Sequence, residues 1–309
     1  MTLKVSLGPV YFHWPLPLWL DFYARMADEA ELDRVYLGEV VCSKRAPFYE
    51  KHYDEVAERL RRGGKEVVFS TLSEVSVRHD RACVQSLCAL EDTLVEANDA
   101  SALYALNGRS HTIGPFINVY NGTTLHELAR RGAKHICLPP ELPAAAVKSM
   151  VQTARKLSIT TEIQGYGRIS LALSARCYHA RALGRTKDNC QYACGADQNG
   201  LTVSTLDKKP FLAVNGIQTL SQGCLSLLPH ISALNEIGPD FFRLAPQGVD
   251  MVQVANIHAR VLKGKLHWQD GARNLQRMWP EAPLIDGFFR HTPGQDHIRA
   301  GEGTKQDCA

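Results

Sequence analysis

Three cysteines, Cys177, Cys190 and Cys194, lie within eighteen residues of one another in the pattern C-x12-C-x3-C. Free cysteines are mostly small buried residues scattered along a chain, so a group of three needs a chemical reason. The surrounding segment is polar and rich in arginine, and a cationic environment favours the thiolate form that binds metals. We interpret the three thiols as ligands of a metal or iron–sulfur site whose fourth ligand lies elsewhere in the chain.

The composition limits the class of protein. The chain has 309 residues, 45% of them hydrophobic and 22% charged, as is typical of a soluble protein with a substantial core. A formal charge of +3 is too small to indicate a nucleic-acid partner. The N-terminal segment lacks the features of a signal peptide, and no run approaches the roughly 20 apolar residues of a membrane helix, so we expect a cytoplasmic protein. In that reducing compartment, nine cysteines indicate metal binding or redox chemistry more than disulfides.

The first half of the chain alternates apolar runs with amphipathic segments. The runs expected to form strands are 3–10, 34–40, 66–72, 101–106, 115–120, 135–139 and 160–167. The segments expected to form helices are 16–31, 49–62, 78–97, 123–131 and 143–157. This order is typical of parallel β/α units, and about seven strands by Gly167 predict a (β/α)8 TIM-barrel-like α/β fold. An open doubly wound sheet is the alternative, although no G-x-G-x-x-G follows the first strand, as its dinucleotide-binding version would require.

The pattern changes after Gly167. Residues 171–199 form a segment rich in cysteine and arginine, and a small β meander is expected over Leu201 to Leu220. A helix over Leu225 to Leu234 and a last barrel strand beginning at Phe241 follow. We therefore expect one barrel-like domain over residues 1–290, with residues 171–199 as the cluster-binding segment, and a flexible tail over residues 291–309.

Cys42 is the best-placed candidate for the fourth ligand. It directly follows the second predicted strand, at the end of the barrel where barrel enzymes keep their active sites. The other candidates are Cys83 and Cys88 on one predicted helix, Cys137 in an apolar strand, Cys224 after a turn and Cys308 in the tail. Four thiolates suit either a tetrahedral zinc ion or an iron–sulfur cluster, and the wide separation of the ligands favours the cluster.

Several segments resemble the U32 peptidase-like family and, within it, the UbiV-type proteins of oxygen-independent ubiquinone biosynthesis. They are SLGPVYFHWP, YLGEVVCSKR with Cys42, LALSARCYHARALGRTKDNC with the following CGAD, FLAVNGIQTLSQG and FFRLAPQGVDM. The C-x12-C-x3-C pattern is the most specific of these features. Gly195 follows Cys194 where some relatives have a further cysteine, which leaves four ligands.

The resemblance implies a [4Fe-4S] cluster on Cys42, Cys177, Cys190 and Cys194. It also implies a heterodimer with a UbiU-type paralogue, assisted by a UbiT-type lipid-carrier accessory protein. The pair hydroxylates ubiquinone precursors without O2, and prephenate is the implied oxygen donor in related proteins. Neither G-x-S-x-G nor H-E-x-x-H occurs, so we do not expect peptidase activity.

Two alternatives to a catalytic subunit stay open. One is a non-catalytic electron-transfer or scaffold partner of the paralogue, and the other is a zinc-stapled binding protein. Polar residues at strand ends are candidate substrate contacts, with ordinary turn and capping roles as the simpler explanation: His13, Trp14, Glu39, Asn107, Asn118, Tyr120, Asn121, Gly122, Gln164, Tyr166, Asn215, Gln218, Arg243 and Gln247. Of these, Arg243 is a hypothetical bidentate clamp for a substrate carboxylate. Arg176 and Arg181 are expected to stabilise the reduced cluster, with surface charge as the alternative.

Overall fold

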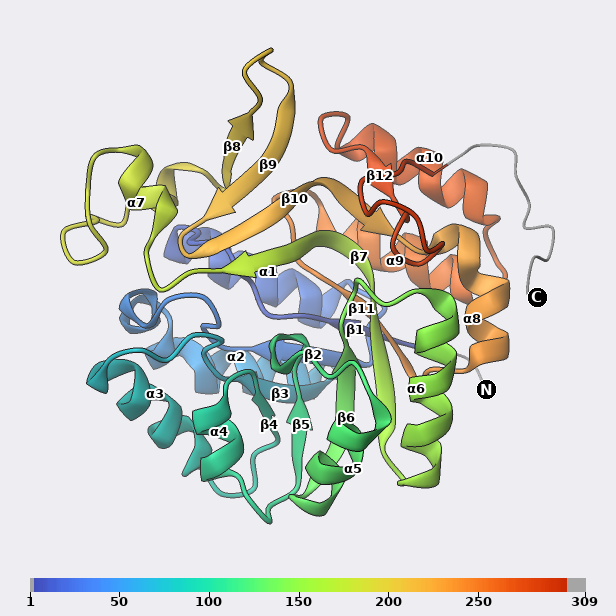
Figure 1. Cartoon of the computed structure of the whole chain (residues 1–309), viewed down its shortest axis with the longest axis horizontal. Coiled ribbons are helices and arrows are strands. Elements are labelled where there is room, and N and C mark those ends of the chain that lie inside the picture. The colour runs from blue at the N-terminus through green and yellow to red at the C-terminus, as the bar shows by residue number, and fades with distance from the viewer. Residues whose placement is uncertain (1–2, 299–309) are drawn as a thin grey trace.

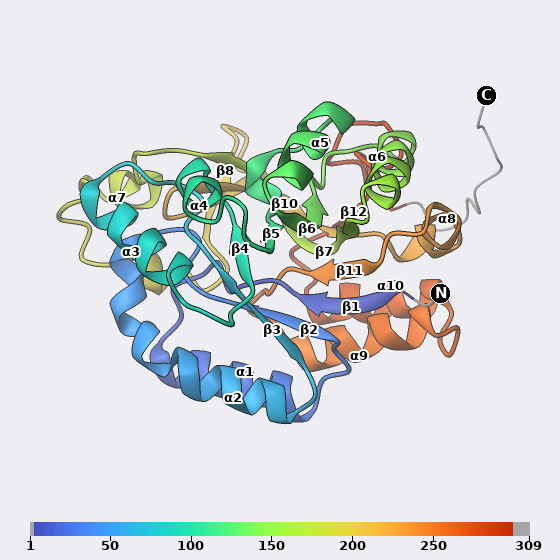
Figure 2. The ribbon, with the colours of Figure 1, turned by 90° about the horizontal axis from the view of Figure 1, so that it is seen from below.

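The protein, seen here as a computed structural model that describes residues 3–298, is built on a closed barrel of eight parallel strands (Figures 1 and 2). In order around the barrel, the strands are β1 (Lys4–Leu7), β2 (Arg34–Leu37), β3 (Glu66–Ser70), β4 (Val95–Ala97), β5 (His111–Ile113), β6 (Ala133–Leu138), β7 (Thr160–Leu173) and β11 (Phe241–Leu244). Strand β11 pairs in parallel with both β1 and β7, which closes the ring. The predicted (β/α)8 fold is therefore confirmed, and the open sheet is wrong.

Helices cover the outside of the barrel between successive strands (Figure 2). They are α1 (Leu16–Asp28), α2 (Tyr53–Arg62), α3 (Arg78–Cys88), α4 (Ala100–Ala105), α5 (Gly122–Arg130), α6 (Ala144–Lys156), α8 (Ile231–Ile237) and α9 (Met251–Leu262), with α10 (Trp268–Met278) packed beside α9. Each long helix buries one apolar stripe; on α1 this stripe includes Trp19, Tyr23 and Met26. Parallel strands need such helical crossovers, which is why helices cover the outer face of the barrel, while its inner face is filled by side chains of the strands.

Strand β7 belongs both to the barrel and to an antiparallel extension of the same sheet. Its first residues pair with β6 and β11 inside the barrel, and its later residues continue outward and pair antiparallel with β10 (Gln218–Ser226). Strands β9 (Pro210–Asn215) and β8 (Leu201–Ser204) continue this extension as a hairpin that projects from the barrel, and β12 (Leu284–Ile285) pairs with the other end of β10 (Figure 1). Strands β8, β9 and β10 form the β meander that the sequence predicts over Leu201 to Leu220.

The cysteine-rich segment connects β7 to β8. It contains one short helix, α7 (Tyr178–Ala182), and one 3-10 turn, η4 (Ala193–Ala196), joined by irregular loops. Figure 1 shows it beside the β8–β9 hairpin at the same end of the molecule. Four other 3-10 turns occur in the described residues: η1 (Ser43–Phe48), η2 (Glu50–His52), η3 (Pro115–Ile117) and η5 (Leu228–His230).

Several predicted elements are wrong. The helix expected over 78–97 ends at Cys88, and 95–97 is strand β4. The run 101–106 is helix α4, which begins after Asp99 because the Asp99 side chain accepts the N–H of Ser101 at 2.7 Å. The run 115–120 is the turn η3 and a loop, and the barrel strand is β5 just before it. The helix expected over 225–234 begins only at Ile231, because β10 continues to Ser226.

Residues 291–298, assigned from the sequence to a flexible tail, hydrogen-bond to the chain just before them. The N–H of Asp286 donates to the carbonyl of Asp296 at 3.2 Å, and the N–H of Ile298 donates to that of Leu284 at 3.1 Å. The rest of the predicted tail, with Cys308, lies outside the described residues. None of the described helices combines the length and the apolar character that a bilayer span requires.

Candidate functional site

Cys42 lies just beyond the carboxyl end of β2, where it begins the turn η1. The preceding loop is held by Glu39, whose Oε1 accepts the N–H groups of Val41 at 2.8 Å and of Cys42 at 2.9 Å. The Cys42 side chain is half-buried, and this burial raises the pKa of its thiol, with the charge of Arg45 acting in the opposite direction. The loop after β2 thus fixes the backbone of Cys42 at the open end of the barrel.

The other three cysteines come from the segment after β7. Cys177 begins α7, and its Sγ accepts the N–H of Ala180 at 3.4 Å. Gln191 and Tyr192 both adopt left-handed φ values, 49° and 52°, so the chain turns sharply between Cys190 and Cys194. All four thiols line one pocket at the carboxyl end of the barrel, so the structure places Cys42 with the three cysteines that follow β7.

The four thiols surround a pocket and do not form the shell of a single ion. Within residues 3–298, no three His, Cys, Asp or Glu side chains are close enough to hold one metal ion. A four-iron cluster has a different requirement, because each of its four thiolates binds a different iron atom. The donor set, four cysteines at one pocket, fits such a cluster.

Two basic residues that follow Cys42 also line the pocket. The Lys44 Nζ donates to the carbonyls of Lys187 at 2.8 Å and Asp188 at 3.0 Å, and lies 3.7 Å from the Cys190 Sγ. Arg45 is buried, and its charge lowers the pKa of the Cys194 thiol, which burial raises more strongly. A permanent cation beside a thiol favours its ionised, metal-binding form.

An aromatic group packs against the same segment. The His13 ring centroid is 5.0 Å from that of Phe48 and 5.7 Å from that of Tyr192, and its Nδ1 lies 2.7 Å from the Tyr49 hydroxyl. Burial and then the charge of Arg45 lower the pKa of His13 to about 4. His13 is therefore neutral at pH 7, and together with Trp14, whose Nε1 donates to the carbonyl of Gln198 at 2.9 Å, it anchors the cysteine-rich segment to the loop after β1.

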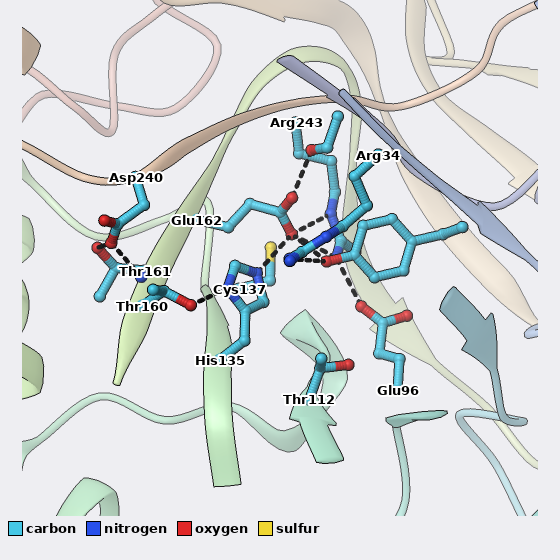
Figure 3. Close-up of polar contacts among 12 residues, drawn as sticks. Arg34, Glu96, Thr112, His135, Cys137, Thr160, Thr161, Glu162, Asp240 and Arg243 are labelled. Carbon is cyan, nitrogen blue, oxygen red and sulfur yellow. Dashed lines mark hydrogen bonds and ion pairs between the residues drawn. The ribbon is translucent and has the colours of Figure 1, made fainter. Parts of the chain in front are cut away.

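A second polar group fills the interior of the barrel (Figure 3). Arg243 on β11 donates from Nε to Glu162 Oε2 at 2.7 Å and from Nη2 to Glu96 Oε1 at 2.6 Å, and all three side chains are buried. The Tyr36 hydroxyl donates to Glu162 at 3.1 Å, and Ser6 also hydrogen-bonds to Glu162. Burial opposes ionisation of Glu162, but the charge of Arg243 together with the contacts from His135 and Ser6 outweighs it and lowers the pKa of this carboxyl far below its usual range.

This pairing bears on the expected role of Arg243 as a substrate clamp. Its guanidinium already has two protein carboxylates as partners and lies within the barrel, so it is not a free cation at the open end. The partners come from β4 and β7, which are 147 and 81 residues away in the sequence. We therefore treat Arg243 as a structural residue of the barrel interior.

The remaining candidates divide between structural and surface roles. Asn215 hydrogen-bonds to Arg45 beside the pocket, and Asn121 caps α5 by accepting the N–H of Thr124 at 2.9 Å. The buried members are Gln164, Tyr166, Gln218 and Gln247, and the exposed ones are Asn107, Asn118 and Tyr120. Asn118 adopts a left-handed φ of 57°, as a turn residue does.

Sequence reasoning missed the basic residues that line the pocket. Lys44 and Arg45 lie two and three residues after Cys42, and that proximity in the sequence was the available signal. The arginines that the sequence favours, Arg176 and Arg181, are exposed, and their side chains form no hydrogen bond to a thiol in the described part of the chain. Of the other cysteines, Cys88, Cys137 and Cys224 are buried away from the pocket, and Cys83 lies on α3.

A parallel (β/α)8 barrel with an inserted cysteine-rich segment at its carboxyl end is the class of protein that these features define. The sequence profile of peptidase family U32 matches residues 23–298, so the chain belongs to that family.

Several solved structures of other proteins have partial similarity to this chain. They are an N-acetylneuraminate lyase from Proteus mirabilis (TM-score 0.37, 10% identity, covering 89% of this chain and 80% of that one), a GH10 endoxylanase from a sugarcane soil metagenome (0.39, 7%, 80% and 85%) and a mandelate racemase/muconate lactonizing protein from Paracoccus denitrificans complexed with magnesium (0.38, 11%, 54% and 49%). The last match spans about half of each protein. At such low scores, the activities of these enzymes say nothing about this chain.

Proposed function

We propose that this chain is the [4Fe-4S]-binding subunit of an O2-independent hydroxylase that acts on ubiquinone precursors in the cytoplasm, a UbiV-type member of the U32 family. The observation that carries the proposal is that Cys42, from the loop after β2, lines the same pocket as Cys177, Cys190 and Cys194. The residue types and their spacing match the UbiV pattern over the segments that resemble that group.

Four cysteine thiolates would hold the cluster and leave no iron coordination position open, so its contribution would be electron transfer. The residues of this chain would exclude water and supply compensating positive charge from Lys44, Arg45 and Lys187. A thiolate held as a ligand is not a free nucleophile, so the proposal does not include proteolysis by these cysteines.

The proposed partners are a UbiU-type paralogue, as the other half of a heterodimer, and a UbiT-type lipid carrier that delivers the precursor. Prephenate is the proposed oxygen donor. These assignments rest on the family resemblance.

A second candidate function is an electron-transfer or scaffold subunit whose chemistry takes place in the paralogue. One observation favours it: the carboxyl end of the barrel, where barrel enzymes bind substrate, is filled by a buried hydrophobic group. This group consists of Tyr11, Val40, Val41 and Ile217, with Phe116 packed against it. To separate the two functions, pocket residues would be changed in each subunit in turn, with the cluster kept intact. Loss of ubiquinone formation only through changes in the partner would make this chain the helper.

The test of the cluster is purification without air, followed by iron, sulfide and zinc analysis. We expect a brown protein with about four iron atoms per chain, as four cysteine ligands require. Cys42→Ser should lose most of the iron, whereas Cys83→Ser, on α3 outside the pocket, should retain it. A colourless protein with one zinc per chain would contradict the proposal and favour the zinc-stapled binding protein. A Cys42→Ser variant with full iron would contradict the assignment of Cys42 as the fourth ligand.

A further inference from the structure

Arg45 is a buried cation without a carboxylate partner. Its side chain is 1% exposed, and its Nη1 and Nη2 donate to two neutral oxygens, the Tyr11 carbonyl at 2.8 Å and the Asn215 Oδ1 at 3.0 Å. No described carboxylate forms an ion pair with it; the nearby Glu39 accepts backbone N–H groups instead. Burying a charge is costly unless an opposite charge lies close by. The buried Glu39 carboxylate acts on this guanidinium without forming an ion pair with it, so an anion in the adjoining cysteine pocket would complete the compensation of its charge.

The surroundings of Arg45 hold its guanidinium at the edge of the cysteine pocket. The Asn215 Nδ2 donates to the Tyr11 carbonyl at 2.7 Å and to Gln218 Oε1 at 3.1 Å, which fixes the amide that accepts from Arg45. Gly216, which also lines the pocket, has a left-handed φ of 62°, and a Cβ at this position would lie 2.7 Å from the Arg45 Nη2. The turn between β9 and β10 therefore leaves room for the guanidinium.

A second cation approaches the pocket from another side. The Lys44 Nζ is 3.7 Å from the Cys190 Sγ, and it is oriented by the carbonyls of Lys187 and Asp188. Arg45 lines the same pocket as Cys194. Two neighbouring residues of η1 thus bring two positive charges to the wall of the cysteine pocket.

We propose that Arg45, assisted by Lys44, is a positioning residue that compensates the negative charge of the thiolate-bound centre and raises its reduction potential. The inference rests on the proposed function, because it requires the cluster. One-electron reduction adds a negative charge, and a fixed cation inside a poorly solvated pocket stabilises the reduced form. Arg45 suits this role because a guanidinium stays charged at every physiological pH. Exposed arginines such as Arg181 lie in water, which screens their effect.

The test is the midpoint potential of the full-length chain, purified without air and titrated with dithionite while the reduced cluster is followed by electron paramagnetic resonance. Iron is counted first in every sample. We expect Arg45→Gln to retain iron and to shift the midpoint to a more negative value, and Arg45→Lys to restore most of the shift. Arg181→Gln is the matched control and should leave the midpoint unchanged.

Asn215→Asp is the second variant, in case Arg45→Gln does not hold iron. It leaves Arg45 in place and gives it a carboxylate partner, so the midpoint should again become more negative; Lys44→Gln should shift it in the same direction. The inference is overturned if Asn215→Asp and Lys44→Gln bind full iron at the wild-type midpoint, or if Arg181→Gln shifts it as much as they do. Absence of iron from the wild-type protein would instead overturn the proposed function, so the two failures are distinguishable.

Discussion

Inside the barrel, single residues carry charges that are balanced only by one another. Arg243 lies between Glu96 and Glu162 (Figure 3). The Tyr36 ring lies against its guanidinium, 3.9 Å from centroid to Cζ. Barrel interiors are usually filled by branched apolar side chains. A buried group of this kind is stable only when complete, because removal of one member leaves an uncompensated charge.

We therefore predict that Glu162→Gln lowers the free energy of unfolding by about 3–5 kcal/mol, the cost typical of breaking a buried ion pair. Urea denaturation followed by tryptophan fluorescence measures this change. Glu127→Gln is the control, because Glu127 pairs with Arg130 and Arg131 on the surface, where such pairs contribute less than about 1 kcal/mol. Similar losses for the two variants would contradict the role assigned to the buried network.

A buried histidine on α9 makes stability depend on pH. His258 packs against Tyr166 and Phe242, its Nδ1 lies 2.8 Å from the Val254 carbonyl, and burial lowers its pKa from 6.5 to about 4. Between these values the unfolded chain binds a proton on this ring that the folded protein does not. Stability from this group is thus fully present above pH 6.5 and is lost as the pH falls towards 4.

The expected loss is on the order of 2 kcal/mol between pH 7.5 and pH 5. It is measured as the difference in free energy of unfolding at the two pH values. His258→Gln, which has no proton to gain in this range, should reduce that difference by about the same amount, whatever its effect at pH 7.5. An unchanged pH dependence in this variant would show that other groups are responsible.

At the scale of elements, β7 connects the barrel to the cysteine pocket. Two glycines allow it to leave the barrel: a Cβ on Gly165 would lie 1.9 Å from the Phe242 ring, and Gly167 has a left-handed φ of 108° with Ala245 2.6 Å from its Cβ position. Because Cys177 follows the end of β7, the path of this strand sets where three of the four cysteines lie.

Gly167→Ala should therefore destabilise the fold by more than the strain of a left-handed residue alone, which is about 1–2 kcal/mol. Gly184→Ala is the matched control, because Gly184 also has a positive φ, 68°, but its Cβ would meet nothing within 4 Å. Urea denaturation of both variants gives the comparison. Equal destabilisation would mean that the crowding beside β7 is relieved at no cost.

Most helices of the barrel could be predicted from the sequence, whereas two of its strands could not. Residues with clear periodicity, such as those of α1, α2 and α6, were placed correctly, and the number of strands before Gly167 was right. Two of those strands were assigned to the wrong residues. Strands β4 and β5 have only three residues each, and their side chains Glu96 and Thr112 point into the polar interior of the barrel, so neither strand forms an apolar run in the sequence. Apolar runs do not mark strands whose inward side chains are polar.

At the scale of the whole molecule, the pocket joins two parts of the chain that are more than a hundred residues apart. The grouping of Cys177, Cys190 and Cys194 could be predicted from spacing, but the position of Cys42 beside them depended on barrel closure and on family resemblance. Arg45 could not be predicted as buried, because its hydrogen-bond partners come from β9 and from the loop after β1. A centre held by all four cysteines would tie the inserted segment to the barrel.

This tie predicts a difference in proteolysis. The inserted segment has little regular structure and carries Arg176, Arg181 and Arg185, so trypsin should cut it first when it opens. Binding of a metal centre only to the folded arrangement stabilises that arrangement, so the loaded wild-type protein should be cut slowly. Cys42→Ser, with the tie removed, should be cut about tenfold faster, which corresponds to about 1.4 kcal/mol of local opening free energy.

Mass spectrometry of the early fragments, taken without air, locates the cuts, and Cys83→Ser serves as the control. Equal cutting rates in all three proteins would mean that the segment is held by its own packing against His13 and Trp14, and that Cys42 does not bind it.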